Sequence, residues 1–188
     1  MEKSDIILTL LAQNDGVIVG TTRMQKLLFL IEKECRITPE DGPFEFQPYR
    51  FGPASKSLYD DFEFLINLGY MTKSDEKSAS ISSHNLDEIE SLSGEDFLDD
   101  EDGDDIDDDE GEVEQDINTA TDDLVVYRIT PAGVQFLKDN GLLEMEDAKA
   151  IDDVRKKYGK KSLLELLRHV YSNYPDYTTE SEIKDKLQ

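Results

Sequence analysis

The stretch TRMQKLLFLIEKEC (residues 22–35) carries the clearest structural signal in the chain. Its apolar residues recur at helical intervals of three and four: Met24, Leu27, Leu28, Ile31 and Cys35. This spacing predicts an amphipathic helix that continues to about residue 36 and turns one apolar stripe toward the core. Thr22 and Gln25 match the capping-box pattern, so we expect the helix to begin there.

Shorter signals lie on either side of this helix. Residues 5–13 predict a short core-facing helix, and residues 17–19 indicate either a brief strand or a turn. After the long helix, residues 44–47 alternate as an edge strand would, and Pro53 is placed to start a third helix. That third helix turns Leu58, Phe62, Leu65 and Ile66 inward and is expected to end at Gly69.

The chain after Gly69 predicts two strands and four helices. The strands cover residues 70–72 and 124–129. Helices are expected from Thr130 to 140, from 148 to 158, from the capping box Ser162…Glu165 onward, and from 179 to 187. This order predicts an α+β, mostly helical fold resembling a winged helix, in which a long wing is followed by C-terminal helices.

The acidity of the chain is concentrated in one segment. The sequence holds 44 acidic and 20 basic residues, a formal net charge of −24. Residues 85–123 contain 20 of the acidic residues and no Lys or Arg, so the remainder totals only −4. Such a segment buries too little apolar surface to offset chain entropy, which predicts a disordered acidic insert. A solubilising role is favoured over competition with nucleic acid for a basic surface.

The chain is therefore expected to divide into three parts. Residues 1–84 and 124–141 form a winged-helix-like core, residues 85–123 the insert, and residues 142–188 a helical extension packed on the core. A single cysteine and the charged opening residues favour the cytoplasm. No apolar run is long enough to predict a membrane span.

Nothing in the sequence points to catalysis, a cofactor or a metal. Cys35 lies on an apolar stripe, which favours a buried side chain over a reactive thiol. His169 lies inside an expected helix, where packing or hydrogen bonding is favoured over a role as a base. The acidic segment fails the calcium-loop register, because Leu98 or Ile106 falls at the first ligand position. We therefore expect a non-enzymatic protein.

Three motifs resemble those of a known family. QKLL at residues 25–28, YRFGP at 49–53 and the following LY at 58–59 together are similar to the Panacea (SocA-like) antitoxin domain. YRITPAG at residues 127–133 resembles the strand-to-helix exit that follows a winged-helix wing. The likeness covers about residues 6–70 and implies a toxin-neutralising or adaptor role exerted by protein–protein binding.

The residues around these motifs form our candidate partner-binding set: Arg23, Lys26, Tyr49, Arg50, Gly52, Pro53, Lys56 and Tyr59. Exposed Tyr and Arg side chains are common anchors of protein interfaces. An equally weighted alternative for Arg50 is an ion pair with Asp60 or Asp61 that fixes the turn to its helix. The partner is expected to be a protein, such as a toxin encoded nearby or a second copy of the chain.

The alternative function is a winged-helix transcription regulator that binds DNA. A basic cluster favours it: Arg155, Lys156, Lys157, Lys160 and Lys161. Against it, the expected third helix exposes Asp60 and Glu63, which repel phosphates. A solvated helix end is the favoured explanation of the cluster, because cations near a helix C-terminus are stabilised by its dipole.

Overall fold

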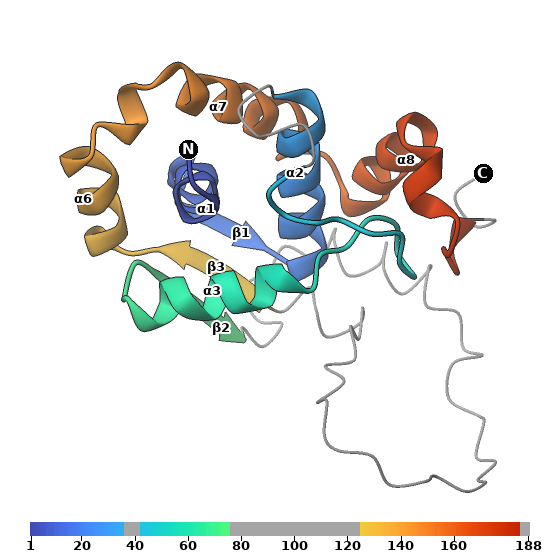
Figure 1. Cartoon of the computed structure of the whole chain (residues 1–188), viewed down its shortest axis with the longest axis horizontal. Helices are drawn as coiled ribbons and strands as arrows, with labels where there is room; N and C mark the ends of the chain where they lie inside the picture. The colour runs from blue at the N-terminus through green and yellow to red at the C-terminus, as the bar shows by residue number, and fades with distance from the viewer. Residues whose placement is uncertain (36–41, 76–124, 185–188) are drawn as a thin grey trace, which may run out of the picture.

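A computed structural model of the chain describes residues 1–35, 42–75 and 125–184. Within them the fold is α+β and mostly helical, with one small antiparallel sheet (Figure 1). The predicted insert at 85–123 lies outside the described residues.

Helix α1 (Lys3–Ala12) forms the centre of the molecule. Six consecutive residues, Ile6 to Leu11, are buried, so the helix is covered on every side. Figure 1 shows it end-on, encircled by α6 (Pro131–Asp139), α7 (Glu146–Tyr158), α2 (Thr21–Glu34) and the sheet. The central position stabilises a helix that carries apolar residues on all its faces, because every face is removed from water.

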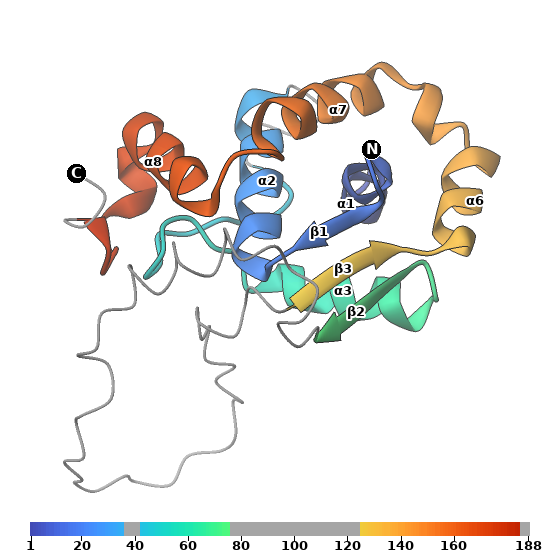
Figure 2. The same ribbon diagram turned by 180° about the vertical axis from the view of Figure 1, so that it is seen from behind.

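In the sheet, the strand that comes last in the chain lies between the other two. Strands β1 (Val17–Val19), β2 (Met71–Asp75) and β3 (Val125–Ile129) pair in the order β1-β3-β2, all antiparallel. Residue Asp75 at the end of β2 lies opposite Val125 at the start of β3. Helix α3 (Ser57–Asn67) runs beside β2 and β3 in both views (Figures 1 and 2).

The C-terminal part packs on the same core as the N-terminal part. Residues Ile151, Val154, Leu166 and Val170 belong to one buried cluster with the residues of α1 and α2. They lie on α7 and on α8 (Leu163–Asn173). Two short 3-10 helices, η2 (Leu142–Glu144) and η3 (Pro175–Thr178), complete the described elements.

Three local capping signals are confirmed. Thr130 caps α6 by accepting the backbone N–H of Gly133, with Pro131 at the first helical position. Ser162 and Glu165 form a reciprocal capping box at the start of α8. Gly69 ends α3 with a φ of +72°, the left-handed conformation that glycine adopts readily.

Four other local expectations are wrong. Helix α3 begins at Ser57 and not at Pro53. Helix α2 begins after Gly20, and the Gln25 side chain bonds Ser55 instead of closing a capping box at Thr22. Residues 44–47 form no edge strand, because only Gln47 pairs, in a bridge with Ala54. Residues 179–183 contain turns and no helix, so the expected helix does not begin at 179; Lys184 is helical, and 185–187 lie outside the described residues.

Candidate functional site

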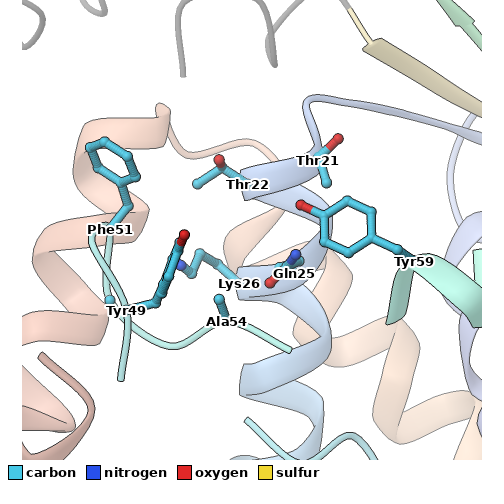
Figure 3. Close-up of a pocket in the computed structure, with 9 residues that line it drawn as sticks. Thr21, Thr22, Gln25, Lys26, Tyr49, Phe51, Ala54 and Tyr59 are labelled. Atoms are coloured by element: carbon cyan, nitrogen blue, oxygen red, sulfur yellow. The ribbon is translucent and has the colours of Figure 1, made fainter. Parts of the chain in front are cut away.

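A pocket opens between the first turns of α2 and the loop that leads to α3. Figure 3 shows the side chains of α2 on one wall and those of the loop and α3 on the others. Its lining residues are Thr21, Thr22, Gln25, Lys26, Tyr49, Phe51, Gly52, Ala54 and Tyr59. The pocket therefore brings together residues of three quoted motifs, QKLL at 25–28, YRFGP at 49–53 and LY at 58–59.

The loop is shaped by a tight turn at residues 49–52. The backbone N–H of Gly52 donates to the Tyr49 carbonyl at 2.9 Å, and Gln47 and Ala54 exchange two backbone hydrogen bonds of 2.9 Å. Gly52 has a φ of +79°, and a Cβ there would lie 3.0 Å from the Tyr171 ring of α8. Glycine is required on both counts, since other residues resist positive φ and the ring leaves little room.

Two consecutive side chains of α2 hold this loop. Lys26 donates from Nζ to the Pro53 carbonyl at 2.8 Å, and the Gln25 Oε1 accepts the Ser55 N–H at 3.1 Å. Both side chains are buried, and Lys26 is only 2% exposed. These bonds satisfy backbone groups that would otherwise be buried without partners, so the loop has a defined position against α2.

The opposite wall connects the pocket to the sheet. The Thr21 hydroxyl lies 2.9 Å from the hydroxyl of Tyr127 on β3. The ring of Tyr59 packs edge-on against Phe62 of α3, and its hydroxyl points toward the α2 wall (Figure 3). The described lining thus comes from two helices, α2 and α3, and from the loop between them, and Thr21 links it to β3.

The candidate partner-binding residues divide into two groups. Lys26, Tyr49, Gly52 and Tyr59 line the pocket, and the Pro53 carbonyl adjoins it through its bond to Lys26. Lys56 is exposed just before α3 and does not line the pocket.

Arg50 and Arg23 hold the C-terminal part of the chain in place. Arg50 forms an ion pair from Nε to Glu182 at 3.2 Å, and its carbonyl accepts from the backbone N–H of Glu182. The expected pair of Arg50 with Asp60 or Asp61 is replaced by this contact. Arg23 donates from Nη1 to the carbonyl of Lys161 at 2.6 Å. Both arginines therefore join the N-terminal and C-terminal parts.

Sequence analysis missed the other pocket residues: Thr21, Thr22, Gln25, Phe51 and Ala54. Gln25 and Phe51 lie inside the quoted motifs, so the motifs themselves contained the signal. The two threonines had none, because their position depends on where α2 begins.

The basic cluster is not one surface. Arg155 is buried at 5% exposure and donates from Nη2 to the Val17 carbonyl of β1 at 2.6 Å, so it is unable to contact phosphate. Lys156 pairs with Asp152 of the same helix, and Lys157 with Glu34 of α2 at 2.9 Å. Lys160 is exposed and Lys161 half-buried. The expectation that these five basic residues together contact nucleic acid or the acidic insert is therefore wrong for Arg155.

A second polar cluster joins α2, α7 and α8. The Tyr158 hydroxyl donates to the Glu34 carboxylate at 2.5 Å and lies 2.9 Å from the His169 Nε2. Burial, followed by the hydrogen bond to Glu34, raises the pKa of Tyr158 to about 12. The side chain of Tyr158 is almost fully buried, so this cluster ties helices together and gives a substrate no access to the hydroxyl.

Cys35 is placed as a packing residue. It is 8% exposed, and burial is the main cause that raises the pKa of its thiol to about 11. A thiol with so high a pKa is a poor nucleophile near neutral pH. Within the three described ranges, no group of His, Cys, Asp or Glu side chains is arranged to hold a metal ion.

No family model, curated protein or solved structure matches the chain. The likeness to the Panacea domain therefore stays a prediction from the motifs. Among the described residues, no helix has both the length and the apolar character needed to cross a membrane.

Proposed function

We propose that this chain is a non-enzymatic interaction protein that binds a protein partner at the pocket between α2 and the 49–59 segment. The observation that carries the proposal is the convergence of four motif residues, Lys26, Tyr49, Gly52 and Tyr59, on one pocket. Tyrosines that are half-buried beside a defined cavity have the character of interface anchors, because they add contact area at little cost in side-chain entropy.

The exposed face of α3 supports a protein partner over DNA. Phe64 and Leu68 are 56% and 48% exposed, and Asp60 and Glu63 are exposed near them. Apolar and acidic side chains on a helix are unsuited to phosphates, whose contacts come mainly from Lys and Arg. The resemblance to the Panacea antitoxin domain adds a specific expectation, namely that the partner is a toxin whose action the chain neutralises.

The test is co-expression of the chain with the product of the neighbouring gene, followed by co-purification and a growth assay. The wild-type chain is expected to form a complex and to restore growth if that product is toxic. Replacing Tyr49 by Ala is expected to weaken the complex by at least about tenfold, because a hot-spot side chain is worth roughly 2 kcal/mol or more.

Tyr70→Ala is the matched control for this test. Tyr70 is also half-buried but stacks on Phe136 of α6, away from the pocket, so its removal is expected to leave binding unchanged. Absence of both a complex and growth rescue with the wild-type chain contradicts the proposal, as does equal weakening by the two substitutions.

A second candidate function is a winged-helix regulator that binds DNA. The strand order β1-β3-β2, with α3 before the β2–β3 pair, favours a winged-helix fold. Fluorescence anisotropy with the chain's own promoter DNA at low and moderate salt tests this function. Salt-sensitive binding that weakens in a Lys156→Ala, Lys160→Ala, Lys161→Ala triple variant supports it, and its absence excludes it.

A further inference from the structure

Two large apolar side chains at the end of α3 are turned away from the core. Phe64 and Leu68 are 56% and 48% exposed, whereas Phe62 of the same helix is 3% exposed. Successive residues of an α-helix are turned by about 100°, so Phe64 lies about 200° round the axis from Phe62. A Cβ at Gly69 would meet no atom within 4 Å, so the surface beyond Leu68 is open as well.

The exposed residues of α3 have the spacing of a helix contact seam. They recur at intervals of three and four residues and form what we call the α3 outer face: Asp60, Glu63, Phe64, Asn67 and Leu68. Leu68 follows the last residue of α3 and keeps a right-handed helical backbone. Side chains with this spacing lie along one side of a helix, where a second helix packs beside the first. A helix is therefore the element that suits this face.

The charged residues beside the apolar pair are acidic. Asp60 precedes Phe64 by four residues, about one helical turn, and Glu63 is adjacent to it. The exposed Lys56 lies a further turn away, before α3 begins. An apolar pair bordered by carboxylates is complementary to apolar side chains bordered by Lys or Arg. The chain as a whole carries a net charge of −24, and such a field attracts cationic segments.

Three other occupants suit the α3 outer face less well. Nucleic acid and anionic lipid surfaces are repelled by Asp60 and Glu63. A second copy of the chain brings the same acidic face and another net charge of −24. Two half-exposed side chains also supply little of the roughly 1,200–2,000 Å² that a stable dimer buries. A protein partner gains further area at the pocket, which Tyr59 of the same helix lines.

We propose that the α3 outer face binds a basic amphipathic helix of the protein partner. This inference rests on the proposed function and adds to it a second contact surface, together with the chemistry that this surface recognises. Apolar side chains of the bound helix pack on Phe64 and Leu68, and its Lys or Arg side chains pair with Asp60 and Glu63. Burial of the apolar side chains supplies affinity, and the charges at the rim select the partner and speed its association.

The experiment uses the full chain and a synthetic peptide. The probe is a peptide of about 18 residues, long enough to form a helix, with Leu at helical spacing on one side and Lys beside it. Two matched peptides carry Glu in place of Lys or Ala in place of Leu. Backbone amide NMR spectra of the chain are recorded at physiological salt during each titration. We expect saturable shifts centred on residues 60–68, and at least about tenfold weaker binding of both matched peptides.

Variants of exposed residues locate the contact without disturbing the core. Phe64→Ser is expected to weaken binding of the Leu/Lys peptide by at least about tenfold. Met145→Ser is its matched control, because Met145 is 42% exposed but lies between η2 and α7. Glu63→Lys is expected to weaken binding severalfold. Glu144→Lys makes the same charge change at an exposed residue of η2 and is expected to leave binding nearly unchanged.

Four results overturn the inference. They are the absence of saturable binding of the Leu/Lys peptide, equal binding of the peptide that carries Glu, equal weakening by Phe64→Ser and Met145→Ser, and self-association of the chain that Phe64→Ser abolishes. The last result assigns the face to a second copy. The peptide test needs no neighbouring gene product, so a failed complex with that product counts against the proposed function alone. A failed peptide test counts against this inference alone.

Discussion

The side-chain oxygen of Gln25 accepts the backbone N–H of Ser55 at 3.1 Å, which joins α2 to the last residues of the loop before α3. Both residues are buried, and Lys26 beside Gln25 bonds Pro53 of the same loop. The position of one pocket wall thus depends on two adjacent side chains of α2. A loop held in this way presents its aromatic residues in a fixed arrangement, which lowers the entropy lost on binding.

Gln25→Leu is expected to destabilise the chain by about 1–3 kcal/mol, because the buried Ser55 N–H loses its acceptor. Urea unfolding followed by circular dichroism measures this loss. Gln135→Leu is the control, since Gln135 is exposed on α6 and its side-chain amide bonds Asp139 of its own helix. A loss at Gln25 no larger than at Gln135 contradicts the expected contribution of the Gln25–Ser55 bond.

Gly133→Ala is expected to destabilise the fold by about 3 kcal/mol. A Cβ at this position would lie 2.2 Å from the Tyr70 carbonyl oxygen, so α6 has to move away from the end of α3 and β2. Gly141→Ala is the comparison, because no atom lies within 4 Å of its Cβ and only the left-handed φ of +65° resists the change. Thermal unfolding should show the lower midpoint for Gly133→Ala, and the reverse order refutes the close contact.

Two tyrosines are expected to ionise only in strong alkali. Burial is the largest cause that raises the pKa of Tyr158 and of Tyr171, each to about 12. These folded-state pKa values exceed the ordinary value of 10.0. The stability that the two neutral tyrosines contribute is therefore fully present below pH 10 and is lost as the pH rises toward 12. Tyrosinate absorbance should show late-ionising groups, and Tyr158→Phe and Tyr171→Phe should each remove one of them. Full ionisation of the folded chain near pH 10 contradicts this.

Arg155→Ala and Lys156→Ala are neighbouring substitutions with different expected costs. Arg155 is buried and bonds the Val17 carbonyl, so its loss should cost about 2 kcal/mol through lost packing and an unsatisfied acceptor. Lys156 is exposed and pairs within its helix, so its loss should leave the stability almost unchanged. Chemical denaturation of both variants checks the difference. Equal stabilities would mean that Arg155 does not contribute through its buried contacts.

Residues 76–124 are expected to be replaceable by Asn-Gly. Because Asp75 and Val125 lie opposite each other, a two-residue turn has the geometry to join β2 to β3 directly. The shorter connection lowers the entropic cost of bringing the two strands together, which should stabilise the fold by about 2 kcal/mol. A Gly-Ser segment of the original length is the control that separates length from composition. Failure of the Asn-Gly variant to fold contradicts the observed register.

Sequence reasoning succeeded where a signal acts within one turn of chain. The apolar stripe of α2, the Thr130 cap and the Ser162–Glu165 box are all local, and their pattern needs no distant residue to be recognised. The capping box expected from Gln25 failed because a tertiary contact took the same side chain. Its pattern was present, but the competing donor, the backbone N–H of Ser55, was not visible in the stretch itself.

The candidate site shows the same division. The motifs supplied Lys26, Tyr49, Gly52 and Tyr59, whereas the place of Thr21 and Thr22 became clear only once α2 was packed against the loop. Arg155 was assigned to a basic surface because of its charge, although its position in the helix indicates burial. It follows Ile151 by four residues and precedes Tyr158 by three, which is the spacing of the buried face of α7.

The central place of β3 has a consequence for the chain as it leaves the ribosome. Both β1 and β2 are synthesised before β3, and neither pairs with the other in the finished sheet. Until Ile129 has emerged, both strands present open edges, which are sites of unwanted association. The sheet is therefore closed by the strand that is made last, and the nascent chain depends on the speed of that step for its solubility.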